Sequence, residues 1–115
     1  MEAYVQGIGV ISPQKTFAGE GFLQDTMEYN DVNYIKCLEP VYGDFIDPMV
    51  ARRMSRMVKM GVCAALKCLK DAGIENPDAI ITGTGLGCIE DTEKFLGSLY
   101  ASEEQLLNPT PFIQS

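Results

Sequence analysis

The sequence contains no histidine. Histidine is the side chain whose ordinary pKa, about 6.5, suits it to accept a proton near neutral pH. Nucleophilic catalysis by cysteine or serine usually needs such a base beside the nucleophile, and none of the four cysteines has a candidate base next to it. The sequence therefore predicts a chain that does not itself hold the reacting groups of an enzyme, and we expect no catalytic residue in it.

Signals for a metal site and for export are also missing. No Cys-x-x-Cys pair accompanies the missing histidine, which argues against a structural zinc site, and we expect neither a metal nor a cofactor. Cys37, Cys63, Cys68 and Cys88 are even in number and could form two disulfides. However, no basic stretch followed by an apolar core marks a secretory signal at the N-terminus. Reduced thiols and a cytoplasmic location are therefore expected.

Charge and hydropathy narrow the possible partners. No apolar run approaches the ~20 residues that cross a bilayer, so no membrane association is expected. The net charge of −7 argues against general nucleic-acid binding. Six of the nine Lys and Arg residues lie between Arg52 and Lys70, which forms one basic segment in an acidic chain. With 115 residues and 46% hydrophobic residues, the chain suits one domain, 1–115.

Two segments have the composition of strands. Residues Ala3 to Ile11 are apolar and β-branched and end at Ser12-Pro13. Gly7 and Gly9 weaken this strand, and the close approach of another backbone or side chain explains them better. Asp78 to Thr82 begins a short apolar strand that runs into the glycine-rich turn Gly83–Gly87. In the segment Gln14–Gly43, short apolar pieces lie among Asn, Asp and Gly residues. We expect this segment to run over the surface and to contain a short strand or helical turn.

The helix signals are clearer. Asp47-Pro48 predicts a capped start, and Gly73 a stop, for one helix over about Pro48–Asp71. Its expected buried stripe consists of residues that step by three or four: Val50, Met54, Met57, Gly61, Ala65, Cys68 and Ala72. Four residues are expected to widen that face: Val58, Val62, Leu66 and Leu69.

A second helix is expected over Glu90–Tyr100, with one more short turn at Ser102–Glu104. No closing element is expected after Asn108. Strand, helix, strand, helix is the pattern of a right-handed crossover on a parallel sheet. Such a sheet needs helices on both faces, so the fold expected is an incomplete α/β layered fold, the opening part of something larger.

Several residues could bind a ligand or react, and each has a structural alternative. The turn Gly83–Gly87 has the pattern G-x-G-x-G, whereas a dinucleotide-binding turn has G-x-G-x-x-G. The Lys of a P-loop is also missing, so a tight turn without a bound nucleotide is the favoured interpretation. Cys88 lies near a helix start, which favours a thiolate, but Glu90, Asp91 and Glu93 oppose it, so a small buried residue is favoured. Cys63 and Cys68 lie five apart and point about 140° away from each other on a helix, which excludes a shared metal.

Two more groups of residues, four methionines and two arginines, each have two possible explanations. The methionines Met49, Met54, Met57 and Met60 could line an acyl-binding surface, although helix packing is the favoured explanation. Arg52 and Arg53 lie in the expected first turn, where the helix dipole disfavours cations. They are expected to pair with Asp44 or Asp47, or else with an acidic partner.

Taken in order, several segments resemble the N-terminal part of the β-ketoacyl-acyl-carrier-protein synthases, of the thiolase-like superfamily. The matching segments cover essentially the whole chain and are Gly7–Pro13, Gly43–Phe45, Arg52–Arg56, Asp71–Ile74, Ile81–Gly87 and Asn108–Phe112. The family's nucleophilic cysteine and two catalytic histidines come after the last of these, so none can be carried over to this chain.

The resemblance implies decarboxylative condensation of acyl and malonyl thioesters in fatty acid or polyketide-type synthesis. Acyl carrier protein would be the parent enzyme's partner, its phosphopantetheine arm would be the only organic group needed, and the assembly would be a homodimer or heterodimer of synthase-like subunits. The chain is then an N-terminal fragment, inactive alone, with the start of a thiolase-like fold. Two alternatives stay open, a non-catalytic synthase-like partner subunit and a small self-associating α/β binding module.

Overall fold

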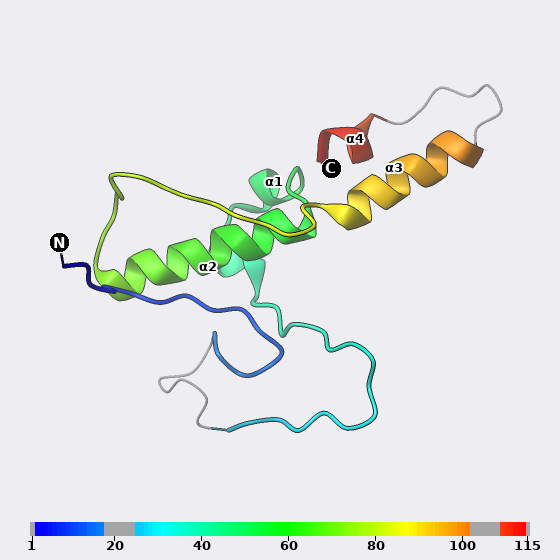
Figure 1. The fold of residues 1–115 in the computed structure, drawn as a ribbon. Helices are drawn as coiled ribbons and strands as arrows, with labels where there is room; N and C mark the ends of the chain where they lie inside the picture. Colours follow the sequence, from blue (N-terminus) through cyan, green and yellow to red (C-terminus); the bar gives the residue numbers. More distant parts are fainter. Residues whose placement is uncertain (1, 18–24, 102–108, 115) are drawn as a thin grey trace.

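One long helix forms the axis of the structure, a computed structural model that describes residues 2–17, 25–101 and 109–114 (Figure 1). The elements, in chain order, are a 3₁₀ turn η1 (Tyr42–Asp44) and the helices α1 (Pro48–Ala51), α2 (Arg56–Ala72), α3 (Ile89–Ala101) and α4 (Thr110–Gln114). The residues between these elements, in the described ranges, form loops and drawn-out segments.

The described residues form no β-strand. The expected parallel α/β layered fold is therefore wrong for this chain, and both predicted strands are corrected. The segments 3–11 and 78–82 are drawn out along α2 but lack the ladder of main-chain hydrogen bonds that defines a strand (Figure 1). A strand needs a neighbour in space, and apolar β-branched composition does not supply one.

The expected single helix over Pro48–Asp71 is two helices. Its start is confirmed, because the Asp47 carboxylate accepts hydrogen bonds from the main-chain N–H groups of Met49 and Val50. The backbone then becomes extended at Ser55, with φ −63° and ψ 163°, and the Ser55 hydroxyl accepts from the Val58 N–H as the N-cap of α2. Serine at this position competes with the preceding helix for the same backbone groups, so the helix restarts there.

The stop of α2 is confirmed. Gly73 has the left-handed conformation, φ 68°, and its N–H bonds to the carbonyls of Leu69 and Lys70. Glycine adopts this conformation without the clash that a Cβ would bring. The α2 helix thus covers seventeen residues, Arg56–Ala72.

The close approach expected at Gly7 and Gly9 is confirmed, and α2 is what approaches. A Cβ built on Gly9 would lie 2.0 Å from the Ala64 carbonyl oxygen, and one on Gly7 would lie 2.5 Å from that of Cys68. The Ile8 N–H donates to Asp71 Oδ2 at 3.0 Å, and the Cys68 thiol donates to the Gly7 carbonyl at 3.2 Å. Residues without side chains on one side and small ones on the other therefore let the N-terminal segment lie directly on the helix.

The expected buried stripe of α2 is wrong for most of its residues. The helix contacts the N-terminal segment through residues four apart, Ala64, Cys68 and Ala72, and the only buried residue in α2 is Cys63. Gly61, Ala65, Met57, Val58 and Leu66 are exposed. Of the stripe predicted from periodicity, Cys68 and Ala72 contact the N-terminal segment, whereas nothing in the described chain covers Met57, Gly61 and Ala65.

The excursion expected at Gln14–Gly43 is a wide loop in its described residues (Figure 1). Both polar ends of the Gln14 side chain bond to the main chain of Met27, at 2.8 and 2.6 Å. The Leu38 N–H donates to the Ser12 carbonyl at 2.9 Å, and the rings of Phe17 and Phe45 stack edge to face with centroids 5.2 Å apart. These contacts tie the loop back to the segment from which it leaves.

At the other end of the molecule, the second expected helix is confirmed as α3, one residue longer at each end than expected. The prediction of no closing element is wrong, since α4 folds back on α3 and the Phe95 and Phe112 rings lie 5.2 Å apart (Figure 1). A five-residue helix is unstable alone, so this contact holds it. The turn expected at Ser102–Glu104 lies outside the described residues.

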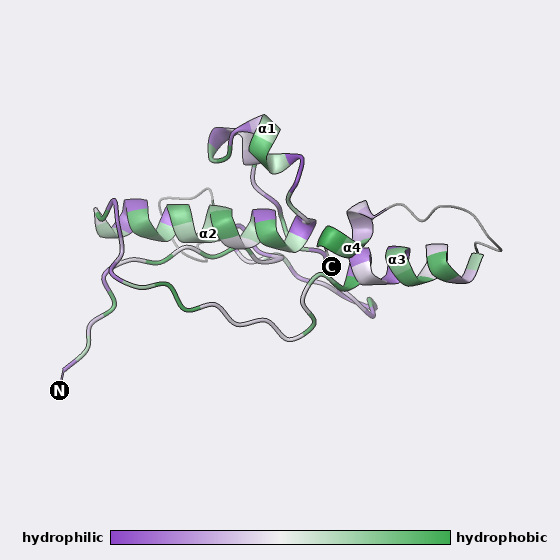
Figure 2. Ribbon diagram, turned by 90° about the horizontal axis from the view of Figure 1, so that it is seen from above, coloured by the Kyte–Doolittle hydropathy of each residue, from purple (hydrophilic) through white to green (hydrophobic). Residues whose placement is uncertain are grey.

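The chain is open. Of the described side chains, only Ile46, Ser55 and Cys63 are buried. The accessible surface is 9796 Å², against about 6,200 Å² expected for a closed globule of this mass. The radius of gyration is 17.7 Å, against roughly 13 Å for a compact domain of this length. The exposed large apolar side chains include Met57, Val58 and Leu66 on α2 and Ile80, Ile81 and Leu86 in the segment after it. Figure 2 shows hydrophobic residues in both of these parts of the chain.

Candidate functional site

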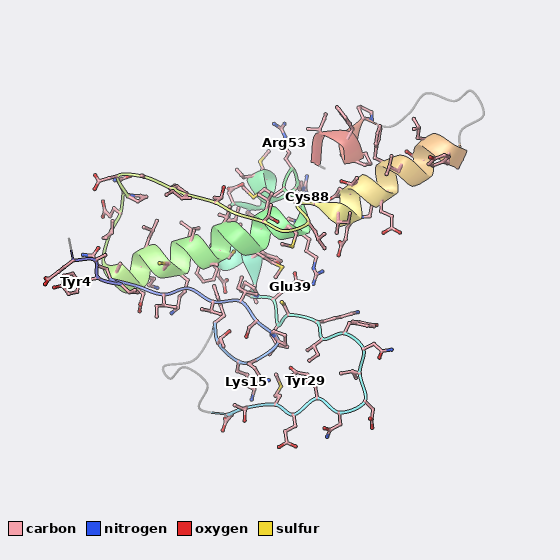
Figure 3. The ribbon with its side chains drawn as sticks, viewed as in Figure 1. Tyr4, Lys15, Tyr29, Glu39, Arg53 and Cys88 are labelled. Atoms are coloured by element: carbon pink, nitrogen blue, oxygen red, sulfur yellow. The ribbon has the colours of Figure 1, made fainter. Side chains whose placement is uncertain are left out.

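The strongest candidate site is the junction where α2 and α3 begin. Ser55 is the N-cap of α2. Cys88 directly precedes α3, and its carbonyl accepts hydrogen bonds from the N–H groups of Asp91 and Thr92. The Ser55 Oγ and Cys88 Sγ atoms lie 3.0 Å apart. Figure 3 shows Cys88 where the start of α3 meets the first turn of α2.

Arg56 connects three segments at this junction. Its Nε donates to Glu39 Oε1 at 2.6 Å, and its NH1 donates to Glu90 Oε1 at 3.1 Å. Arg56 is the first residue of α2, where the helix dipole disfavours a cation by a few tenths of a kcal/mol. Two carboxylates offset that cost, and they attach the loop before η1 and the first turn of α3 to α2.

Glu39 is the centre of a second contact. It accepts a short hydrogen bond from the Tyr42 hydroxyl. This bond, together with Arg56, holds the pKa of the Glu39 carboxyl below its usual value. Partial burial and the same bond raise the pKa of Tyr42, and the hydrogen bond and charge of Glu39 raise the pKa of Arg56. These shifts favour an ionised Glu39, a protonated Arg56 and a neutral Tyr42 hydroxyl. The Lys59 ammonium lies 6.0 Å from the Tyr42 ring centroid.

A shallow hollow of about 350 Å³ lies beside the junction. Its wall is formed by the first two residues of α2, the glycine-rich turn and the residues that follow the turn into α3: Arg56, Met57, Thr84, Gly85, Leu86, Gly87, Cys88, Ile89, Glu90 and Asp91. The turn is closed by the Gly87 N–H, which donates to Thr84 Oγ1 at 3.0 Å, and Gly87 has φ 58°. The expected tight turn into a helix is therefore confirmed, although no strand precedes it.

The hollow does not have the parts of a nucleophilic centre. Among the hydrogen bonds of the described residues, the Cys88 thiol has the Ser55 hydroxyl as its partner, and no carboxylate bonds to either group. The nearby acids are engaged elsewhere, Glu90 with Arg56 and Asp91 with Lys94 at 3.7 Å. Activation of a thiol needs a base or a cation in contact with it. The arrangement therefore joins two helix ends.

The other three cysteines lie apart from this junction. Cys63 is fully buried, as expected for core filling, and burial raises the pKa of its thiol. Cys68 donates to the Gly7 carbonyl, and Cys37 is half-buried. All four are free thiols. In the part of the chain that the structure describes, no three His, Cys, Asp or Glu side chains lie close enough together to hold a metal ion.

The expected pairing of Arg52 and Arg53 is wrong for the described residues. Asp47 uses its carboxylate on the start of α1, and no ion pair joins either arginine to Asp44 or Asp47. Both arginines are exposed, and Figure 3 shows Arg53 beside α1. Met49 is 76% exposed on α1, and Met57 is 48% exposed at the hollow, so helix packing does not account for these two methionines.

Two contacts in this region were missed from the sequence. The Ser55 N-cap could be recognised in the sequence, since serine is a preferred N-cap residue. It was missed because one continuous helix was predicted between Asp47 and Gly73. The Arg56–Glu39 pair joins residues seventeen apart across a loop, and no spacing rule predicts such a contact.

Among the helices of the described ranges, none is long and apolar enough to cross a bilayer. Comparison of the sequence with protein-family models and with curated proteins, and of the structure with solved structures, found no match. The family resemblance noted in the sequence therefore rests on the quoted segments alone.

Proposed function

We propose that this chain is the N-terminal part of a β-ketoacyl-acyl-carrier-protein synthase and is inactive alone. In this proposal it supplies surroundings for a reactive centre whose cysteine and histidines lie in polypeptide outside these 115 residues. The parent reaction joins an acyl thioester to the carbanion that a malonyl thioester forms on losing carbon dioxide. Acyl carrier protein delivers both substrates to the parent enzyme.

The observation that carries the proposal is the open surface. Three buried side chains in the described residues cannot enclose a reaction that must exclude water from a carbanion. The chain also lacks histidine, and in the described residues no hydrogen bond joins a thiol to a carboxylate or an amine. A protein built in this way fits a supporting role better than a catalytic one.

The six family-like segments add support because they come in one order along the chain. The structure gives three of them a local role: Gly7 and Gly9 lie on α2, Ser55 and Arg56 start α2, and Gly83–Gly87 turns into α3. The proposal does not include a parallel sheet, because the described residues form none.

The experiment is to read the coding sequence that follows Ser115 and to test its product. The proposal expects a cysteine at the head of a helix, followed by two histidines. Another residue at the cysteine position, with the rest of the pattern kept, would make the chain part of a non-catalytic partner subunit. A stop codon directly after Ser115 would contradict the proposal.

A further inference from the structure

The wide loop over residues 25–41 leaves apolar side chains uncovered. Tyr34 is 75% exposed, Val32 is 54% exposed and Ile35 is 44% exposed. The loop projects away from α2 (Figure 1). In the described chain, no main-chain N–H or C=O of residues 28–37 has a hydrogen-bond partner. Both the side chains and the backbone of this loop are therefore free to contact another molecule.

Three carboxylates on the same loop have no ionic partner. Asp25, Glu28 and Asp31 are exposed, and among the described residues none of their carboxylates takes part in an ion pair or a hydrogen bond. Lys36 is the only cation in the sequence of residues 25–41, so the loop is acidic. The exposed Tyr34 ring adds an aromatic face. Carboxylates and aromatic faces hold arginine and lysine side chains, so the loop offers a surface that fits cations.

A hollow of about 250 Å³ lies at the base of the loop. Its wall is mostly apolar and is formed by residues 14–17 and 38–40, where the loop leaves and returns. The wall holds one charge of each sign, Lys15 and Glu39. Gln14, which is part of this wall, bonds to the main chain of Met27, and this places the loop's acidic stretch next to the hollow. An apolar side chain can therefore enter the hollow while a neighbouring cation reaches the carboxylates of the loop.

We propose that the loop face, residues 25–38 with the hollow at its base, binds a polypeptide segment that carries arginine or lysine beside apolar residues. The cations of that segment meet the carboxylates of Asp25, Glu28 and Asp31, and their aliphatic stems cover Val32 and Ile35. A metal ion or a small polyamine would use the carboxylates alone and leave the apolar side chains uncovered. A nucleic acid would be repelled by the same carboxylates. This inference goes beyond the proposed function, since it depends on no reaction and stands or fails without it.

The experiment measures the fluorescence anisotropy of a labelled peptide, Gly-Arg-Val-Arg-Val-Arg-Gly, as the purified chain is added at low and at physiological salt. A second peptide with glutamate in place of arginine shows whether positive charge is needed. Spermine is added as a competitor, because it carries positive charge without apolar side chains. Hydrogen exchange with and without the arginine peptide locates the binding surface.

Two pairs of substitutions test the carboxylates. Glu28→Gln together with Asp31→Asn removes two of them from the loop, and asparagine tolerates the left-handed conformation of Asp31, φ 55°. The matched control is Glu75→Gln together with Asp78→Asn, which makes the same change in net charge at two exposed carboxylates outside the loop. Circular dichroism checks that each variant keeps its helices.

Two further variants test the aromatic ring. Tyr34→Leu removes the ring and keeps an apolar side chain, and the dissociation constant of the arginine peptide should become about threefold larger, the effect of one exposed cation–π contact. Tyr100→Leu is the control, because this ring is 87% exposed on α3. An equal effect of the two variants would contradict the inference.

The expected result is saturable binding of the arginine peptide that weakens as salt is added. Its dissociation constant should be about fivefold larger for the variant at Glu28 and Asp31, the effect of two exposed ion pairs, and unchanged for the control pair. The amides of residues 28–37 should exchange more slowly when the peptide is bound. The absence of saturable binding would overturn the inference. So would equal weakening by the two charge variants, equal binding of the glutamate peptide, complete displacement by an equal concentration of spermine, or association of the chain with itself through the loop.

Discussion

The Ser55 hydroxyl and the Cys88 thiol, 33 residues apart in the chain, lie 3.0 Å from each other and join the first turns of α2 and α3. Ser55 also caps α2 through the Val58 N–H. Ser55 is buried, with 5% of its surface exposed, and its hydroxyl therefore makes two contacts, the N-cap bond and the contact with Cys88. Substitutions at this position test the contribution of the cap.

Ser55→Ala removes both the cap and the contact with Cys88. We expect a loss of about 1 kcal/mol in the stability of α2, since that is the usual cost of replacing an N-cap serine by alanine. Hydrogen exchange of the Val58 amide measures it. Ser55→Gly is the control, because glycine at an N-cap costs only a few tenths of a kcal/mol. Equal acceleration of exchange in both variants would show that the cap is not what matters.

Gly9→Ala should detach the N-terminal segment from α2. Its Cβ would lie 2.0 Å from the Ala64 carbonyl, and overpacking of this kind typically costs about 1–3 kcal/mol. Limited proteolysis of the first residues and exchange of the Ile8 amide report the detachment. Gly61→Ala on α2 is the control, since nothing lies within 4 Å of its added Cβ. We expect it to stabilise the helix by about 0.5–1 kcal/mol. An N-terminal segment that stays in place in Gly9→Ala would show that the close approach is absent in solution.

The contacts of Glu39 predict a pH dependence. Because the folded-state pKa of Glu39 is lowered from 4.5, its contribution to stability is fully present above that value and is lost as the pH falls through the lower folded pKa. Tyr42→Phe removes the largest cause of the lowering, and Arg56→Gln removes the next favourable contact. Both should raise the pKa of Glu39, which an NMR titration of its carboxyl measures. Arg52→Gln, at an exposed arginine outside this cluster, should leave the titration unchanged, and an unchanged titration in Tyr42→Phe would refute the account of the cluster.

Phe112→Ala should release α4 from α3. The pair of rings 5.2 Å apart is worth about 0.5–1.5 kcal/mol beyond its buried area, and a helix of five residues does not persist without a contact. Fast exchange of the Ile113 amide, which bonds to the Pro109 carbonyl, would report the release. Ile113→Ala is the control, since that side chain is 76% exposed. Slow exchange in Phe112→Ala would mean that another contact holds α4.

The sequence predicted the features that depend on near neighbours. Asp47-Pro48 and Gly73 determine where the helical region begins and ends, because caps act within one turn. The role of Gly7 and Gly9 was also predicted, since paired glycines in an apolar segment have few other uses. The partner that approaches them could not be named, because nothing local relates them to Ala64 and Cys68.

The prediction of two strands was wrong for a physical reason. Residues 3–11 and 78–82 have the composition of strands, but pairing is a contact between distant segments, and the described chain brings no such pair together. The buried stripe predicted on α2 is wrong for most of its residues for a similar reason. Periodicity shows which side chains could be buried together, but it does not show which other segment covers them. The Arg56 contacts with Glu39 and Glu90 are equally non-local, which is why the junction was not predicted from the sequence.

The central claim is that this chain surrounds a reactive centre without holding it. The most direct test is a condensation assay with acyl- and malonyl-carrier substrates, in which mass spectrometry of the carrier detects the product. The purified chain is assayed alone and together with the polypeptide encoded after Ser115. The account predicts no product from the chain alone and product from the two together. Product from the chain alone, or none from a folded combination of the two, would contradict it.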